Sequence, residues 1–200
     1  INKAVQHTGT PIRQTLYQAS SQQGHEFLNY FCNKKILLVM GGGLGATKIN
    51  RIIRQALPVL TQMFFVVHLT GQGKLDSSYV KTKSYQQYEY LDQHFPAVLK
   101  AADIVISRAG SNSINELIAL EKPHILIPLK QGSRGDQVQN ARYYTERNLS
   151  LTLEEEKLTK ELLLRALNND FQQQRKALQA LPKQNAVAQI RNIINRLAAQ

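Results

Sequence analysis

Short apolar runs alternate along this chain with longer stretches in which apolar residues recur every three or four positions. The clearest run, Ile36–Met40, is apolar at every position and lies between two lysines and a glycine cluster. Such a run is typical of a strand that is covered on both faces of a parallel sheet. Further strands are predicted by the runs Phe64–Leu69, Ile104–Ser107 and Ile125–Pro128.

The segments between these runs have the spacing of helices. The first of them places apolar residues on one helical face: Ile49, Ile52, Ile53, Ala56 and Leu57. Strands that alternate with helices predict βαβ units, and right-handed crossovers place helices on both faces of the sheet. We therefore expect an α/β fold with a Rossmann-like, doubly wound parallel sheet, and ligands at the carboxyl ends of its strands.

The two flanks differ from this centre. Residues 1–33 are polar and without a strong period, which predicts a lead-in segment with one short helix, so that the domain proper covers residues 34–200. The chain closes with helices, the last from about Ala186 to Leu197, whose apolar face holds Val187, Ile190, Ile193, Ile194 and Leu197. The first residue is Ile1 rather than methionine, as expected of a fragment.

Charge narrows the classes of partner. Lysine and arginine (25) exceed aspartate and glutamate (14), giving a net charge of +11, which favours anionic partners. The basic residues are scattered and are not interleaved with aromatic residues, which argues against nucleic acid. No apolar run has the length of a membrane span or of a signal peptide. The single cysteine, Cys32, forms no internal disulfide, which fits a reducing compartment.

A glycine cluster, Gly41–Ala46, directly follows the strongest strand and precedes a helix. Glycines let the backbone approach a ligand closely, and the N–H groups of a helix start attract an anion, so a phosphate is expected here. A tight turn without a ligand is the alternative. The spacing is not that of a P-loop, and Ala46 weakens a dinucleotide fingerprint. No acidic residue follows Phe64–Leu69 to bind a ribose in the dinucleotide manner.

A second glycine turn lies in Ser107–Glu116, after another predicted strand. Ser111, Asn112 or Ser113 would cap the next helix and offer N–H groups to an anion. Glu116 lies one turn inside, where its carboxylate can accept hydrogen bonds from a vicinal diol. The alternative is a capping box between Ser113 and Glu116.

Other polar segments are less specific. Gln131–Ala141 predicts a loop that runs into a helix, with amides suited to sugar hydroxyls or merely to solvent. Glu154–Glu156 predicts a solvated helix start. The histidines have no metal-site spacing, and His68 is expected to be a hydrogen-bonded residue at a strand end. We find no general base.

Five motifs together resemble the MurG family, and they occur in that family's order. They are Thr8–Arg13, Gly41–Ala46, His68–Gly71, Ser107–Glu116 and Gly135–Ala141. This family transfers N-acetylglucosamine from UDP to lipid I, which gives lipid II for peptidoglycan. The resemblance implies a GT-B enzyme of two Rossmann-like domains, of which this chain is similar to the C-terminal, donor-binding one.

The resemblance also assigns roles near the diphosphate and the base. Arg13 corresponds to an arginine near the donor phosphates, and Gly42 and Gly43 to the loop beside the pyrophosphate. Leu91 corresponds to a residue whose backbone binds uracil. The family often has Ser-Gln where this chain has Gly43-Leu44, so only backbone contacts are expected of that loop.

For the sugars, the resemblance implies that Ser111, Asn112 and Ser113 surround phosphate and sugar. It implies that Glu116 binds the ribose and that Gln137 reads the sugar hydroxyls. The expected donor is UDP-N-acetylglucosamine, with no metal and no cofactor.

The remaining implications concern the rest of the enzyme. An N-terminal domain, missing from this chain, would bind lipid I and carry the catalytic base. The parent would be peripheral at the cytoplasmic face of the bacterial plasma membrane, an anionic surface, whereas the isolated domain is expected to be soluble and inactive in transfer.

Three alternatives stay open. One is another GT-B enzyme, such as a UDP-N-acetylglucosamine 2-epimerase or a diacylglycerol glucosyltransferase. An epimerase would need carboxylates and histidines in its cleft, which we do not find. The second is a non-catalytic subunit of a split glycosyltransferase, and the third is a dinucleotide oxidoreductase domain.

Overall fold

Six parallel strands form the centre of the molecule in a computed structural model, which describes residues 5–42, 46–79, 82–130, 135–183 and 185–198. The strands are β1 (Lys35–Met40), β2 (Phe64–Leu69), β3 (Tyr85–Tyr88), β4 (Ile104–Ser107), β5 (His124–Leu126) and β6 (Leu151–Thr152). Their order is β3-β2-β1-β4-β5-β6, and each neighbouring pair is parallel. The predicted α/β, Rossmann-like doubly wound fold is confirmed, because this order reverses direction between β1 and β4.

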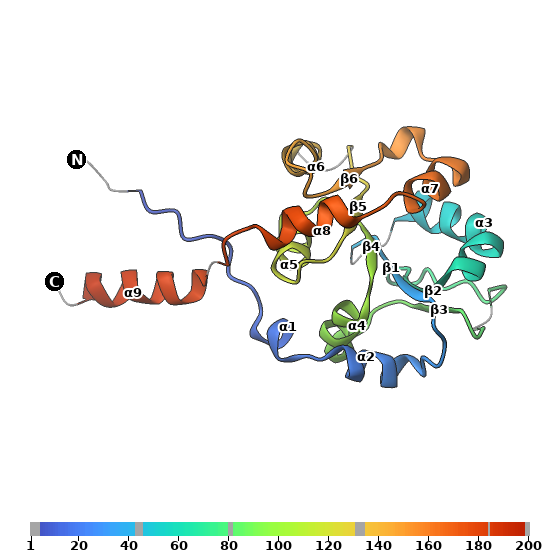
Figure 1. Ribbon diagram of the computed structural model, residues 1–200, viewed down its shortest axis with the longest axis horizontal. Coiled ribbons are helices and arrows are strands. Elements are labelled where there is room, and N and C mark those ends of the chain that lie inside the picture. Colours follow the sequence, from blue (N-terminus) through green and yellow to red (C-terminus); the bar gives the residue numbers. More distant parts are fainter. Residues whose placement is uncertain (1–4, 43–45, 80–81, 131–134, 184, 199–200) are drawn as a thin grey trace.

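Helices cover both faces of this sheet (Figure 1). In chain order they are α1 (Gln14–Gln18), α2 (Ser21–Leu28), α3 (Thr47–Met63), α4 (Phe95–Ala101), α5 (Ser111–Ala119), α6 (Asp136–Thr145), α7 (Lys160–Leu167), α8 (Gln172–Gln179) and α9 (Ala186–Ala198). Two short 3-10 helices, η1 (Asp92–His94) and η2 (Glu155–Lys157), lie in connections.

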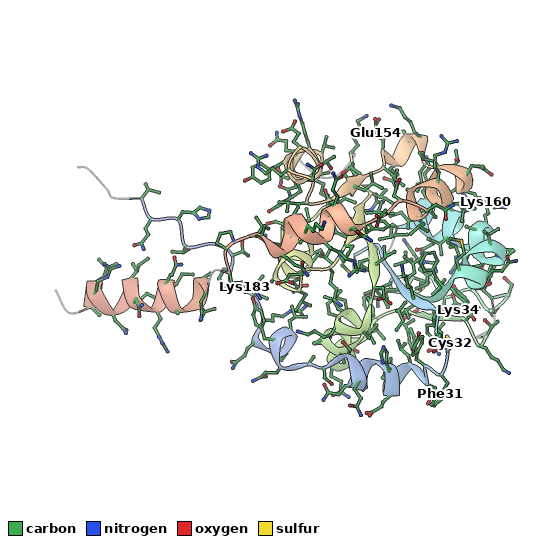
Figure 2. The ribbon with its side chains drawn as sticks, viewed as in Figure 1. Phe31, Cys32, Lys34, Glu154, Lys160 and Lys183 are labelled. Atoms are coloured by element: carbon green, nitrogen blue, oxygen red, sulfur yellow. The ribbon has the colours of Figure 1, made fainter. Side chains whose placement is uncertain are left out.

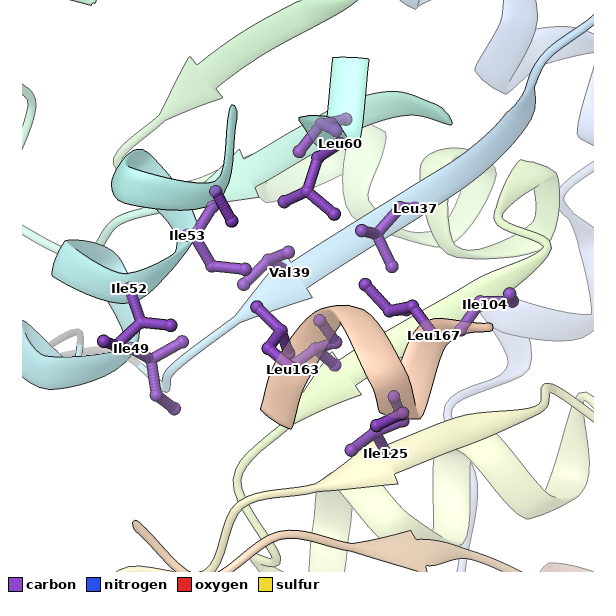
Figure 3. Close-up of a cluster of buried hydrophobic side chains, with 14 of the residues drawn as sticks. Leu37, Val39, Ile49, Ile52, Ile53, Leu60, Ile104, Ile125, Leu163 and Leu167 are labelled. Atoms are coloured by element: carbon purple, nitrogen blue, oxygen red, sulfur yellow. The ribbon is translucent and has the colours of Figure 1, made fainter. Parts of the chain in front are cut away.

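The central strand β1 is apolar from Ile36 to Met40 because helices pack on both sides of it. Leu37 and Val39 face α3 and α7, in the cluster that Figure 3 shows. Ile36 and Leu38 face the opposite side, where α1, α2 and α4 pack. Successive side chains of a strand point to opposite faces of the sheet. A strand between two helical layers therefore needs apolar residues at both odd and even positions.

The segment before β1 holds two helices rather than the one short helix that was expected. Leu16 of α1 and Leu28 of α2 are fully buried against the sheet face that α4 also covers. A methyl group added at Gly24 of α2 would lie 2.4 Å from the Ala97 carbonyl oxygen of α4. This segment therefore contributes to the core, and its polar composition reflects the exposed faces of two short helices.

Strand β3 was not predicted because its sequence, Tyr-Gln-Gln-Tyr, is polar. Two of its side chains are nevertheless buried, and both are hydrogen-bonded. The Gln86 amide donates to the Leu28 carbonyl at 2.7 Å, and the Tyr85 hydroxyl lies 3.2 Å from His68 Nδ1. Polar groups are tolerated inside a protein when they have partners, and hydropathy patterns do not register such partners.

The last helix, α9, confirms the predicted closing helix and projects away from the body of the molecule (Figure 1). Lys183, labelled in Figure 2, precedes it and pairs with Glu121 at 3.2 Å. Val187, Ile194 and Leu197 of its apolar face are exposed. Among the described residues, no helix is both long and apolar enough to cross a membrane. Nor do three His, Cys, Asp or Glu side chains in the described ranges gather as a metal site would require.

Candidate functional site

A pocket of about 640 Å³ lies beyond the carboxyl ends of the strands, beside the point where the strand order reverses. Ligands of open α/β sheets bind at this position. Its walls come from the segment before α1, the strand ends and the start of α5. The lining residues are Thr10, Pro11, Ile12, Arg13, Met40, Gly42, Leu69, Glu89, Tyr90, Leu91, Asp92, Phe95, Asn112, Ser113 and Glu116.

The glycine turn after β1 brings backbone to this pocket. Gly42 has φ +87°, which L residues with side chains rarely adopt, and the space where a Cβ would stand is open. A Cβ on Gly41 would instead lie 2.7 Å from the Ala46 nitrogen, so this glycine allows the turn to close tightly onto the start of α3. Gly42 thus gives a ligand access to the backbone, as expected of a phosphate-binding turn.

The start of α5 differs from its prediction. Gly110 is the N-cap, no side chain caps the helix, and no capping box forms between Ser113 and Glu116. The side chains of α5 therefore do not accept from its first N–H groups, and these can bind another acceptor. Asn112 and Ser113 line the pocket at this end. Since no described side chain caps these amides, the helix N-terminus is suited to an anion.

Glu116 turns toward Arg13 instead of capping α5. The Arg13 Nη2 and Nε lie 2.7 Å and 2.9 Å from the same oxygen, Glu116 Oε1. The arginine side chain is 56% exposed and the glutamate side chain 14% exposed. The guanidinium carbon also lies 5.5 Å from the centre of the Phe95 ring, a cation–π distance. Among the described residues, both bonds of Glu116 to Arg13 use Oε1, so its second carboxylate oxygen, Oε2, can accept from a hydroxyl.

The wall after β3 was largely missed by the sequence analysis. Glu89, Tyr90 and Asp92 line the pocket there beside Leu91, the one member of this group that was predicted. The Leu91 side chain is buried, and its carbonyl accepts a hydrogen bond from the His94 N–H at 2.8 Å. Recognising β3 as a strand would have identified these residues, since they follow its carboxyl end.

The side-chain charges of the pocket do not favour an anion. Among the described residues that line the pocket, one arginine, Arg13, accompanies three carboxylates, those of Glu89, Asp92 and Glu116. Attraction for a phosphate must then come mainly from backbone N–H groups at Gly42 and at the start of α5, which carry partial positive charge.

Most of the predicted site residues meet at this pocket. Those that line it are Arg13, Gly42, Leu91, Asn112, Ser113 and Glu116. Ser111 opens α5 but does not line the pocket, and its carbonyl accepts from the Asn115 amide at 2.8 Å. Gln137 lies in α6, away from the lining, and its Oε1 accepts from the Leu129 N–H at 3.0 Å. Gly43 lies outside the described residues.

His68, at the end of β2, is a hydrogen-bonded core residue, as predicted. Its Nε2 lies 3.0 Å from Asn50 Oδ1, and the Asn50 amide donates to the Thr70 carbonyl at 2.8 Å. Burial lowers the pKa of His68 to about 3, with a smaller contribution from the nearby Arg54 charge. The imidazole is therefore neutral at physiological pH and ties β2 to α3.

Known proteins resemble this chain in sequence. The family described as the glycosyltransferase family 28 C-terminal domain matches residues 36–197. A UDP-N-acetylglucosamine–N-acetylmuramyl-(pentapeptide) pyrophosphoryl-undecaprenol N-acetylglucosamine transferase of Lachnoclostridium phytofermentans is 45% identical over 179 residues, 89% of this chain and 50% of that protein. The like-named transferase of Legionella pneumophila is 48% identical over 166 residues, 82% of this chain and 46% of that protein.

Solved structures resemble it in fold. Acinetobacter baumannii MurG superimposes with a TM-score of 0.71 at 20% identity, covering 96% of this chain and 57% of that one. The glycosyltransferase of kitacinnamycin gives a TM-score of 0.66 at 18% identity, covering 82% and 43%. These neighbours are GT-B glycosyltransferases, which confirms the expected half of a GT-B fold. The chain spans about half the length of the curated relatives it matches. By sequence and by fold, this chain belongs to the glycosyltransferase family 28 C-terminal domain family.

Proposed function

We propose that this chain is the donor-binding half of a glycosyltransferase that moves N-acetylglucosamine from UDP to the undecaprenyl-linked muramyl pentapeptide lipid I, forming lipid II. In this proposal residues 34–200 are the donor domain, with the segment up to residue 33 leading into it. The observation that carries the proposal is the meeting of Glu116, Arg13 and Gly42 around one pocket at the switch point of the sheet. Relatives that bear this transferase name support the choice of donor and acceptor.

Each part of UDP-N-acetylglucosamine finds suitable chemistry in this pocket. The ribose diol would donate to the Glu116 carboxylate, whose Oε2 is available. The pyrophosphate would lie between the Gly42 backbone and the first N–H groups of α5. When the bond from the anomeric carbon to UDP breaks, negative charge grows on the diphosphate, and Arg13 and the helix start would stabilise that charge. Leu91 N–H would bind uracil, and Gln137 would contact the sugar once its bond to Leu129 opens.

The acceptor side belongs to the rest of the enzyme in this proposal. The half that this chain does not span would bind lipid I, whose hydroxyl is the acceptor, and would carry the base. The excess of basic residues would help to hold the parent enzyme at the anionic cytoplasmic face of the plasma membrane. We accordingly expect this chain by itself to bind the donor but not to transfer N-acetylglucosamine to lipid I. Efficient transfer by the chain alone would contradict this assignment of the two substrates to separate halves.

Calorimetric titration tests donor binding directly. We expect saturable binding of UDP-N-acetylglucosamine, weaker binding of UDP-glucose and none of NAD. Glu116→Gln should weaken the affinity by roughly 10- to 100-fold, because a charge-assisted bond to a hydroxyl contributes about 1.5–3 kcal/mol. The matched control is Glu146→Gln, which removes an exposed carboxylate that pairs with Arg142 far along α6. A preference for NAD, or no binding of any UDP ligand, would refute the proposal.

A further inference from the structure

The short helix η2 contacts basic residues from three different segments, and none of these residues lines the pocket. Arg108 Nη2, from the turn between β4 and α5, lies 2.6 Å from Glu155 Oε1. Lys48 Nζ, from the first turn of α3, donates to the Glu156 carbonyl at 2.9 Å. Lys130 Nζ, after β5, lies 3.6 Å from Glu156 Oε1. Glu154, labelled in Figure 2, marks where this segment begins.

The contacts correct part of the sequence interpretation. The run Glu154–Glu156 was expected to be a solvated helix start, and the Glu154 and Glu156 side chains are indeed exposed. Glu155 is different, because only 17% of its side chain is exposed and its partner Arg108 is 12% exposed. A nearly buried ion pair has lost most of its water, so it persists only with good geometry and additional hydrogen bonds.

Arg108 has such an additional bond, and it connects two strand ends. Its Nη1 donates to the Ile127 carbonyl, just after β5, at 3.1 Å. The Ile127 N–H in turn donates to the Ser107 carbonyl at the end of β4 at 2.8 Å. On the other side of the turn, the Asn140 amide of α6 donates to the Ala109 carbonyl at 3.1 Å. The turn is thus held by residues that do not line the pocket.

We propose that the Arg108–Glu155 ion pair is a positioning element for the donor site, which it does not touch. Arg108 lies two residues before Gly110, the N-cap of α5. Any shift of the turn moves the whole helix start, including the pocket residues Asn112, Ser113 and Glu116. The planar guanidinium fixes direction as well as distance, because two of its three nitrogen atoms, Nη1 and Nη2, bond to two different segments of the chain. This role rests on the proposed function, since its consequence is donor affinity.

Stability alone is an insufficient reason for this arrangement. Replacing a buried ion pair with apolar residues is often neutral or stabilising, so such a pair is weak evidence for a stabilising role. A positioning role predicts instead that breaking the pair loosens the turn locally and weakens donor binding. A variant that loses the same global stability elsewhere in the chain would show neither effect.

The experiment combines hydrogen exchange with titration in Arg108→Gln, Arg108→Lys and Glu155→Gln. Two amides report on the turn, those of Ile114, bonded to the Gly110 carbonyl, and of Ile127, bonded to the Ser107 carbonyl. The Val66 amide, bonded to the Ser84 carbonyl across the sheet, reports on global opening. The matched control is Lys157→Gln, which breaks an exposed pair with Glu154 in the same helix.

In Arg108→Gln and Glu155→Gln we expect exchange at Ile114 and Ile127 to rise about tenfold, with Val66 unchanged. Affinity for UDP-N-acetylglucosamine should fall about tenfold in both variants and no further in the double variant, because the two residues act together. Arg108→Lys should recover part of the affinity, since it keeps the charge but loses the second bond. Lys157→Gln should match the wild type.

Equal exchange at Ile114 and Ile127 in the variants and the wild type, or an equal rise at Val66, would overturn the positioning role. Unchanged donor affinity in the variants would overturn it as well. If the wild type binds no UDP ligand, the proposed function fails, while the exchange rates still decide whether the ion pair positions the turn.

Discussion

Arg13 and Glu116 are 103 positions apart in the chain and form an ion pair in the lining of the pocket, in which two arginine nitrogens share one carboxylate oxygen. The pair connects the segment before α1 to the first turns of α5. Because only Glu116 Oε1 is used, the same two side chains can bind each other and a ligand at once. The ion pair therefore orients both side chains without blocking the pocket.

The first prediction concerns this pair. Arg13→Gln should weaken binding of UDP-N-acetylglucosamine by roughly 10-fold or more, because it removes a charge beside the diphosphate and releases Glu116. The free energy of unfolding should hardly change, since exposed ion pairs contribute little to stability. Titration and urea denaturation measure the two effects. Arg142→Gln, which breaks another exposed pair, is the control, and equal affinities in Arg13→Gln and the control would contradict the prediction.

A second prediction separates backbone strain from ligand access at Gly42. Gly42→Ala and Gly73→Ala both place a Cβ on a residue with positive φ, +87° and +67°, and in both cases the space around that Cβ is open. Each should therefore lose about 1 kcal/mol of stability to strain alone. Only Gly42 lines the pocket, so only Gly42→Ala should also lose donor affinity. Similar affinity losses in the two variants would show that the Gly42 backbone does not approach the ligand.

The third prediction concerns acid. Burial lowers the pKa of His124 to about 4 and that of His68 to about 3, against 6.5 for the exposed side chain. The folded chain then binds fewer protons than the unfolded chain below about pH 6.5, so stability falls as the pH falls through this window. At pH 5 the loss should be on the order of 2 kcal/mol for each histidine.

Urea denaturation at pH 7 and at pH 5 checks this in the wild type and in His124→Gln and His68→Gln. Each substitution should shrink the difference between the two pH values, whatever it does to stability at pH 7. His7→Gln, at an exposed position, is the control. A difference that stays the same in both core variants would show that other groups cause the acid sensitivity.

A fourth prediction concerns the contact between α2 and α4. Alanine normally stabilises a helix interior by about 1 kcal/mol relative to glycine. At Gly24 the added methyl would lie 2.4 Å from the Ala97 carbonyl oxygen and 2.8 Å from the Ala101 Cβ. Overpacking costs about 1–3 kcal/mol, so Gly24→Ala should lower the free energy of unfolding. Gln22→Ala on the exposed side of α2 should change it by less than about 0.5 kcal/mol, and a stabilised Gly24→Ala would mean that the two helices are not closely packed.

The strands and turns that were predicted share a local cause. The run Ile36–Met40 is apolar at both odd and even positions because helices cover both faces of the sheet there. Such a run can be recognised in the sequence without knowing which residues pack against it. Gly41 directly follows β1, and Gly110 comes three residues after the end of β4. Parallel strands align their carboxyl ends, so the sequence was sufficient to place both turns at one edge of the sheet.

The tertiary structure alone decided which side chains meet. Strand β3 is polar, and its burial depends on partners such as Leu28, 58 positions away from Gln86. Glu116 could cap its own helix, but it binds the distant Arg13. Glu155 could face solvent, but it binds Arg108, 47 positions away. The sequence determined the apolar strands and the helices between them, because the period of burial is local. It did not determine these pairs, because their geometry depends on how distant elements pack.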